Sequence, residues 1–259
     1  MSNLSLMGLY EVGAHRGNSK TTLNPKLRSK VHSFNNGIAV IDLAQTLENI
    51  EHVAAFMQKL GSKKKQILFV GTSKHIKAKV QPYSALFKGS TMPFVDKRYI
   101  GGTFSNWVTI KETLKTLKKL ESIQLNADFF KKLARKEQLS INKEQTKINA
   151  TFGGLRHLKS AKPAVVVVLD AANETVVIKE AQVMGIPVIC LTNTAILSLP
   201  KDMQNTLVFN INSTNAVDLV MNTLSEAYNS GLLEVVKEDE VVPVAVSDVK
   251  KAPKMTKVL

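Results

Sequence analysis

Four consecutive valines, Val165–Val168, constrain the fold of this chain more than any other feature. The run does not alternate between apolar and polar residues, so both faces of a strand there must be buried, as in a parallel sheet covered by helices on each side. Apolar runs at Gln66–Val70, Pro187–Leu191 and Leu207–Ile211 alternate with helical patterns. The sequence therefore predicts an α/β fold: a doubly wound, mostly parallel sheet in a three-layer sandwich of the flavodoxin or Rossmann kind.

Capping and turn residues predict the elements beside this sheet. Ile38–Ile41 is predicted to be a strand of the sheet domain, and Asp42 to cap a helix from residue 43 to about residue 60. Gly71–Ser73 is predicted to turn the chain into a helix that carries Lys74, which would give a strand, a tight turn and a helix N-terminus.

Residues 103–152 interrupt the alternation, because they have a helical pattern without a strand-like run. One apolar stripe contains Trp107, Ile110, Leu114 and Leu117. A second contains Ile141, Ile148, Phe152 and Leu155. Two such helices are predicted to form an antiparallel helical hairpin with its turn near Gln124–Asp128.

The segment Arg98–Trp107 joins this hairpin to the short strand Pro93–Val95. Gly101 and Gly102 are predicted to allow a sharp turn and a close approach where strand becomes helix. Trp107 shares the apolar stripe of the first helix, so it is predicted to pack at the hairpin root instead of stacking on a base.

Four regions follow from these patterns. They are a basic N-terminal extension (1–36), a sheet domain (37–102 and 153–232), the inserted basic hairpin (103–152) and a tail of low core potential (233–259) that is predicted to be disordered.

The net charge of +14 is concentrated in three segments. Residues 1–36 hold five basic and one acidic side chain, residues 61–100 hold nine and one, and residues 111–147 hold ten and five. Such patterning favours a nucleic-acid surface over a merely solvated one, and no amphipathic anchor favours a membrane. The predicted RNA contacts are Arg16, Lys20, Lys26, Arg28, Lys30, Lys63, Lys64, Lys65, Lys74, Lys97, Arg98 and Lys111, expected on one continuous surface.

The sequence offers little for catalysis. Gly71–Lys74 lacks the second half of a nucleotide-binding loop, although the turn could hold one phosphate or be a plain capped turn. Asp170 follows a strand, where it could serve an enzyme or cap the next turn. The alternative hypothesis is a nucleotide-dependent α/β transferase that uses the carboxyl edge of the sheet near Gly71 and Asp170.

Metal and redox chemistry are not indicated. The single cysteine, Cys190, lies in an apolar run, and no histidine has a partner at a metal-ligand spacing. We therefore expect no metal, no cofactor and no catalytic residue. There is no signal-peptide pattern and no run of 18 apolar residues, so a soluble protein of a reducing compartment is expected.

Several motifs in order resemble one known family, the bacterial-type ribosomal protein S-two, over roughly residues 6–230. They are Gly13–Gly17 with Asn24–Lys26, Ile67–Thr72 followed by lysine, Arg98–Gly102 with Asn106–Trp107, and Ile178–Ala181 with Gly185–Val188. The chain departs from the family at Arg16, Leu23 and Tyr99, where aromatic residues or tryptophan are usual. Leu191–Ile196 also lacks two carboxylates of the family's pattern, so the chain is identified as a divergent member.

The resemblance implies a structural, non-catalytic role in the small ribosomal subunit, in the cytoplasm or in an organelle. It implies docking on ribosomal RNA next to the first, third, fifth and eighth proteins of that subunit, without homo-oligomer formation. The residues expected to shape the fold are Gly13, His15, Gly17, Asn24, Pro25, Gly101, Gly102 and Trp107.

Overall fold

The computed structural model describes residues 4–126, 130, 132–196 and 203–240. Its elements, in chain order, are α1 (Leu6–Glu11), β1 (Arg16–Ser19), the 3₁₀ helix η1 (Pro25–Lys30), β2 (Val31–Asn35), β3 (Ile38–Ile41), α2 (Leu43–Ser62), β4 (Ile67–Val70), α3 (Lys77–Leu86), β5 (Phe94–Val95), α4 (Trp107–Leu125), α6 (Arg135–Phe152), the 3₁₀ helix η2 (Gly153–His157), β6 (Val165–Val168), α7 (Thr175–Val183), β7 (Val188–Thr192), β8 (Thr206–Val208) and α8 (Thr214–Glu240).

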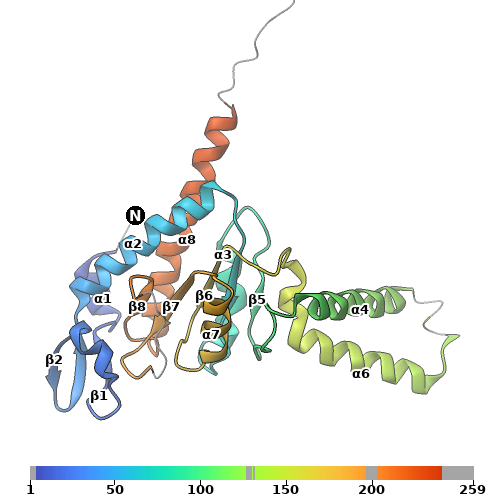
Figure 1. Ribbon diagram of the computed structural model, residues 1–259, viewed down its shortest axis with the longest axis horizontal. Helices are drawn as coiled ribbons and strands as arrows, with labels where there is room; N and C mark the ends of the chain where they lie inside the picture. Colours follow the sequence, from blue (N-terminus) through green and yellow to red (C-terminus); the bar gives the residue numbers. More distant parts are fainter. Residues whose placement is uncertain (1–3, 127–129, 131, 197–202, 241–259) are drawn as a thin grey trace, which may run out of the picture.

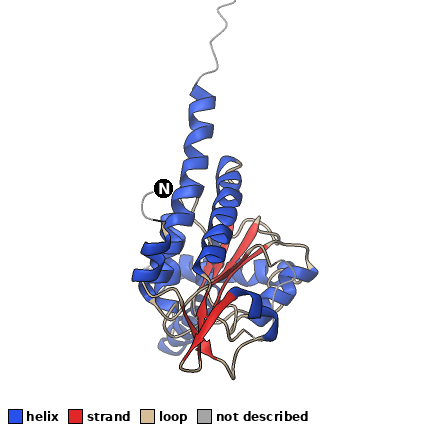
Figure 2. Cartoon of the chain, turned by 90° about the vertical axis from the view of Figure 1, so that its left-hand side faces the viewer, coloured by secondary structure: helices blue, strands red, loops and turns tan. Residues whose placement is uncertain are grey.

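The predicted parallel sheet is confirmed, with the strand order β5-β4-β6-β7-β8. Every residue of β4, β6 and β7 is buried. Val165 and Val167 pack into one apolar cluster with α2, α3 and α8, whereas Val166 and Val168 pack into another with α7 and η2. Figure 2 shows helices on both sides of the sheet. Four consecutive valines are therefore required, because each face of β6 meets an apolar layer.

The N-terminal residues form a second, antiparallel sheet with the strand order β1-β3-β2. Asn35 pairs with Ile38, and the two residues between them, Asn36 and Gly37, both have positive φ angles of 48° and 77°. Asn-Gly is the preferred pair for such a two-residue hairpin turn. The strand Ile38–Ile41 thus belongs to this small sheet instead of the parallel one, and the boundary predicted between residues 36 and 37 divides a hairpin.

Helices α2 and α8 lie side by side on one face of the parallel sheet (Figure 1). Asp42 caps α2 as predicted, accepting a hydrogen bond from the backbone N–H of Ala44 at 3.0 Å. The two helices meet at glycines: a Cβ on Gly61 would lie 2.0 Å from the carbonyl oxygen of Tyr228. α8 runs to Glu240, so residues 233–240 of the predicted tail are helical, and residues 241–259 lie outside the described residues.

The predicted hairpin consists of α4 and α6, and it projects sideways from the sheet domain (Figure 1). α4 buries Ile110, Leu114, Leu117 and Leu120. α6 buries none of its residues fully, and Trp107 is half-buried against the cluster that contains α7. The connection lies between Leu125 and Arg135; residues 127 and 128 of the predicted turn lie outside the described residues.

Two predicted bounds differ from the structure. α3 begins at Lys77 and not before Lys74, because residues 73–76 form a turn in which the carbonyl of Ser73 accepts hydrogen bonds from the N–H groups of Ile76 and Lys77. The strand predicted to end at Ile211 ends at Val208. Among the described residues, no helix is long and apolar enough to cross a membrane.

Candidate nucleic-acid interface

The polar side chains at the carboxyl edge of the parallel sheet bind one another. Asp170 is buried and accepts hydrogen bonds from the Asn173 side chain at 2.6 Å, the Ala172 N–H at 3.2 Å and the Ser73 hydroxyl. Asp170 therefore caps its own turn and ties it to the turn after β4, which is the structural one of the two roles expected for it.

Glu174 has the same kind of role one turn later. It is buried and accepts hydrogen bonds from the Thr72 N–H at 2.9 Å and from the Thr72 hydroxyl. Burial raises the pKa of Glu174 above its usual range, and the neighbouring Asp170 carboxylate acts in the same direction. Since the N–H of Thr72 already has a carboxylate partner and α3 begins at Lys77, the turn Gly71–Lys74 is not a phosphate-binding helix N-terminus.

The Arg98–Trp107 segment is held by a residue that the sequence analysis did not single out, Glu180 of α7. Its Oε1 accepts hydrogen bonds from the N–H groups of Phe104 and Ser105, both at 2.9 Å, and from the Ser105 hydroxyl at 3.0 Å. Its Oε2 accepts from the Gly102 N–H at 3.0 Å and the Tyr99 hydroxyl at 2.9 Å. One carboxylate therefore fixes the whole turn from which the hairpin begins.

The electrostatics of Glu180 follow from these five hydrogen bonds. Partial burial on its own would raise the pKa of Glu180, but the hydrogen bonds from Ser105, Tyr99, Phe104 and Gly102 outweigh it and hold the pKa below its usual range. Burial, together with the hydrogen bond to Glu180, raises the pKa of the Tyr99 hydroxyl. The signal in the sequence was Glu180 in the motif Ile178–Ala181, but its partners lie about 75–81 positions away.

The two predicted hinge glycines differ. Gly102 has φ = +91°, a conformation that side-chain-bearing residues rarely adopt, so the predicted sharp turn is present there. Gly101 has ordinary φ, and a Cβ on it would meet only Val176 at 3.6 Å. Gly101 is therefore not required for a close approach.

The N-terminal motifs attach the small antiparallel sheet to the parallel one. Asn24 caps η1 through the Lys26 N–H at 2.9 Å, and its side chain donates to the Ile196 carbonyl at 2.7 Å. A Cβ on Gly17 would lie 2.8 Å from the Ala39 carbonyl oxygen, so a larger residue does not fit there.

The other motif residues shape the same region. Pro25 is at the first turn of η1, and Gly13 has φ = +74°. The ring of His15 stacks on Tyr10 at 4.4 Å between centroids. The structural roles expected of these residues stay predictions.

The twelve predicted RNA contacts lie in three places. The first set surrounds the small antiparallel sheet, and it comprises Arg16, Lys20, Lys26, Arg28 and Lys30. The second follows the carboxyl ends of β4 and β5 and comprises Lys74, Lys97, Arg98 and Lys111. The third precedes β4 and comprises Lys63, Lys64 and Lys65. Strand β4 lies between the third set and Lys74 along the chain, and one continuous surface for all twelve cations stays a prediction.

The cations of the first two sets keep their charge available. All twelve are exposed except Lys30, which is half-buried. Within the described residues, the members of the first two sets form no ion pair, whereas Lys79 and Arg156 pair with Asp218 and Glu121. Arg28 and Lys20 lie over the Phe34 ring, at 4.3 and 5.7 Å from its centroid.

Fold and surface together define a class: an α/β protein in which a parallel sheet supports a projecting helical hairpin, with edge carboxylates used internally and cations left exposed. Residues 9–231 match the family model described as Ribosomal protein S2, and the chain belongs to this family.

Relatives in this family cover most of the chain. It is 33% identical over 232 residues to the protein of Amoebophilus asiaticus named small ribosomal subunit protein uS2, covering 90% of this chain and 72% of that protein. It is 31% identical to the protein of the same name from Shewanella frigidimarina, covering 89% of this chain and 93% of that protein. It is 33% identical to the protein of the same name from Idiomarina loihiensis, covering 88% of this chain and 91% of that protein. The resemblance found in the sequence motifs is confirmed.

Proposed function

We propose that this chain is a structural component of the small ribosomal subunit, held there by its exposed cations on ribosomal RNA, and that it catalyses no reaction. The proposal is supported by family membership and by one structural observation above all: nine exposed or half-exposed cations around the small sheet and the carboxyl edge have no acidic partner in the described part of the chain. Unpaired lysines and arginines bind phosphates and release condensed counterions.

The hairpin supplies the orientation of this contact. Because Glu180 holds the turn at residues 99–105 against α7, the hairpin leaves the sheet domain in one direction. A projecting arm of fixed direction suits recognition of a folded RNA by its shape. Trp107 packs at the hairpin root, so we expect it to hold the arm instead of stacking on a base.

The partners and compartment follow the same proposal. The chain acts in ribosomes of a cytoplasm or an organelle, next to the first, third, fifth and eighth proteins of the subunit. Leu191–Ile196 lacks two carboxylates, and two of its residues serve the N-terminal motifs instead: Thr194 bonds to the N–H of Asn18 at 2.8 Å, and the carbonyl of Ile196 binds Asn24.

Reconstitution tests the RNA contact. Small subunits depleted of their S2 protein would be mixed with the chain and sedimented over a series of salt concentrations. The double variant Lys74→Gln/Arg98→Gln should dissociate at lower salt, and the slope of log K against log salt should fall by about 1.5, since each lost phosphate contact removes roughly 0.7–0.9.

The matched control is Lys59→Gln/Lys179→Gln, two exposed lysines of α2 and α7 outside the predicted sets. It should behave as the parent does. Equal salt slopes for the parent and Lys74→Gln/Arg98→Gln would contradict the proposal. The transferase alternative is not supported, and calorimetry with free nucleotides should give no binding heat.

A further inference from the structure

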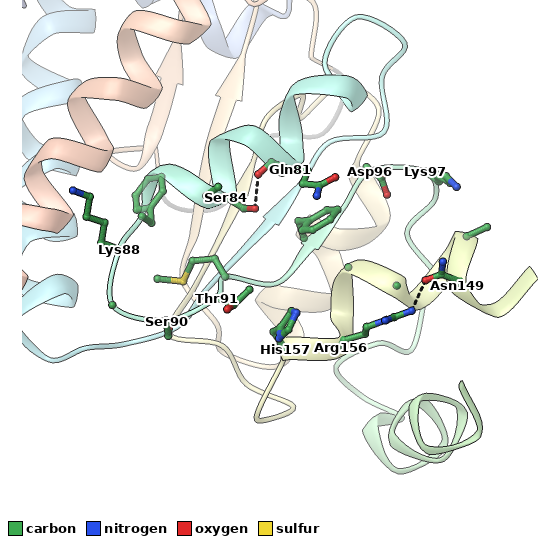
Figure 3. A pocket seen from close by; sticks show the side chains of 18 residues that line it. Gln81, Ser84, Lys88, Ser90, Thr91, Asp96, Lys97, Asn149, Arg156 and His157 are labelled. Atoms are coloured by element: carbon green, nitrogen blue, oxygen red, sulfur yellow. Dashed lines mark hydrogen bonds between the residues drawn. The ribbon is translucent and has the colours of Figure 1, made fainter. Parts of the chain in front are cut away.

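A cleft of about 740 Å³ lies between α3 with its following loop and the root of the hairpin. Figure 3 shows Lys88 and Lys97 on opposite sides of it, with Arg156 and His157 on the hairpin side. The loop of Lys88 is fixed from outside the cleft, because its N–H donates to the Asn229 side chain of α8 at 2.8 Å.

A second hollow, of about 370 Å³, continues from this cleft toward the beginning of β4. Ser90 lines both hollows. The second one is lined by Lys64, Lys65, Lys159 and Lys162. We call the two hollows together the basic trough.

Gln66 connects the walls of the basic trough. Its side-chain amide donates to the carbonyls of His157 at 2.6 Å and Thr91 at 3.2 Å, and its Oε1 accepts from the Lys159 N–H at 3.1 Å. Three segments distant in sequence are thus held in one place. The trough is shaped before any partner arrives, which lowers the cost of ordering it on binding.

The charge of the basic trough is almost entirely positive. Lys88, Lys97, Lys159 and Lys162 are exposed and form no ion pair within the described residues. Arg156 is already neutralised by Glu121 at 2.5 Å and binds Asn149 at 2.7 Å. Among the described residues that line the two hollows, Asp96 is the one carboxylate.

The shape and lining select one kind of polyanion. Two connected, open hollows suit a polymer with regularly spaced charges better than a single small ligand. Of the phenylalanine rings that line the cleft, Phe87 is buried and Phe94 is half-buried against the core, so His157 is the exposed ring among the described residues that line it. Lysines on flexible stems contact phosphates without reading sequence.

We propose that the basic trough binds the sugar-phosphate backbone of a folded RNA, as a contact that shares Lys97 with the set at the carboxyl ends of β4 and β5 but does not include Lys74, Arg98 or Lys111. This inference rests on the proposed function, because it takes ribosomal RNA as the partner. It adds Lys88, Lys159 and Lys162, which the sequence analysis did not select, and it places Lys64, Lys65 and Lys97 in the same site.

A salt titration tests it in the reconstituted subunit. Lys159→Gln/Lys162→Gln should lower the salt slope by about 1.5, the effect of two lost phosphate contacts, while Lys59→Gln/Lys179→Gln leaves it unchanged. Suppose that Lys159→Gln/Lys162→Gln binds the subunit as the parent does, while Lys74→Gln/Arg98→Gln binds it more weakly. The proposal that the trough binds RNA is then overturned, and the proposed function stands. If neither double variant differs from the parent, both fail.

A tethered probe locates the partner directly. The one native cysteine, Cys190, is buried, so a cysteine at Ser160 beside the trough can be labelled selectively with iron-EDTA in the full chain. Hydroxyl radicals from this position should cut ribosomal RNA in assembled subunits, whereas a probe at Asn222→Cys on α8 should not cut the same nucleotides. If the probe at Ser160→Cys cuts no ribosomal RNA, or cuts only a neighbouring protein, the proposal is overturned.

Discussion

The parallel sheet and the helical hairpin are stabilised in different ways. β4, β6 and β7 are buried along their entire lengths, and apolar layers cover both of their faces. The hairpin buries four residues of α4 and none of α6 fully, and its direction depends on one carboxylate at its root. Buried apolar surface stabilises the sheet, whereas a few hydrogen bonds to Glu180 fix the direction of the hairpin.

The largest expected effect lies in the sheet. Phe69→Ala should lower the free energy of unfolding by about 3–5 kcal/mol, because Phe69 is fully buried and packs against Phe87 with centroids 4.9 Å apart. Leu139→Ala on α6, where the side chain is 52% exposed, should change it by less than about 0.5 kcal/mol. Urea denaturation followed by circular dichroism measures both. Equal losses would erase the distinction between the two regions.

The second-largest loss of stability is expected at the root of the hairpin. Glu180→Gln should cost about 2 kcal/mol, because a neutral amide replaces a carboxylate that accepts five hydrogen bonds. Hydrogen exchange should accelerate at the amides of Gly102, Phe104 and Ser105 while those of β6 stay protected. Lys179→Gln, one residue earlier on the exposed face of α7, is the control. Unchanged exchange at the root would show that packing alone orients the hairpin.

The same carboxylate makes this contribution depend on pH. Since the folded-state pKa of Glu180 is lowered, its stabilising effect is complete above the unfolded pKa of about 4.5 and is lost as the pH falls through the folded value. The stability difference between the parent and Glu180→Gln should therefore be constant near pH 7 and shrink below pH 4.5. A difference that grows on acidification would have the wrong sign for this account.

The smallest effect should come from the hinge glycines. Gly102→Ala should cost about 1 kcal/mol through the strain of φ = +91°, whereas Gly101→Ala should be close to neutral. Thermal unfolding of the two variants compares them within one turn. Similar losses of stability in Gly101→Ala and Gly102→Ala would mean that the turn adjusts to a side chain at either position.

Both the parallel sheet and the helical hairpin could be predicted from short sequence patterns. The valine run, the cap at Asp42 and the apolar stripe of α4 each depend on neighbours a few positions away, so they identified the sheet, α2 and the hairpin. The strand Ile38–Ile41 was assigned to the other sheet because an apolar run does not state its pairing partner, although Asn36–Gly37 signalled a hairpin turn.

The sites were harder, because side chains distant in sequence build them. Lysine-rich segments were visible, and the strand predicted at Gln66–Val70 already lay between Lys65 and Lys74, but the sequence did not show which lysines are neighbours in space. Nor could it show that Lys88, Lys159 and Lys162 flank one trough that Gln66 holds in shape.

By itself, the sequence determined the class of fold, the presence of a basic helical arm and the family, since periodicity and short motifs are local properties of the chain. Only the tertiary structure decided which cations share a surface and how Asp170, Glu174 and Glu180 are used. The physical reason is that hydrogen bonds and electrostatic forces act over a few ångströms in space, regardless of the number of residues between the groups they join.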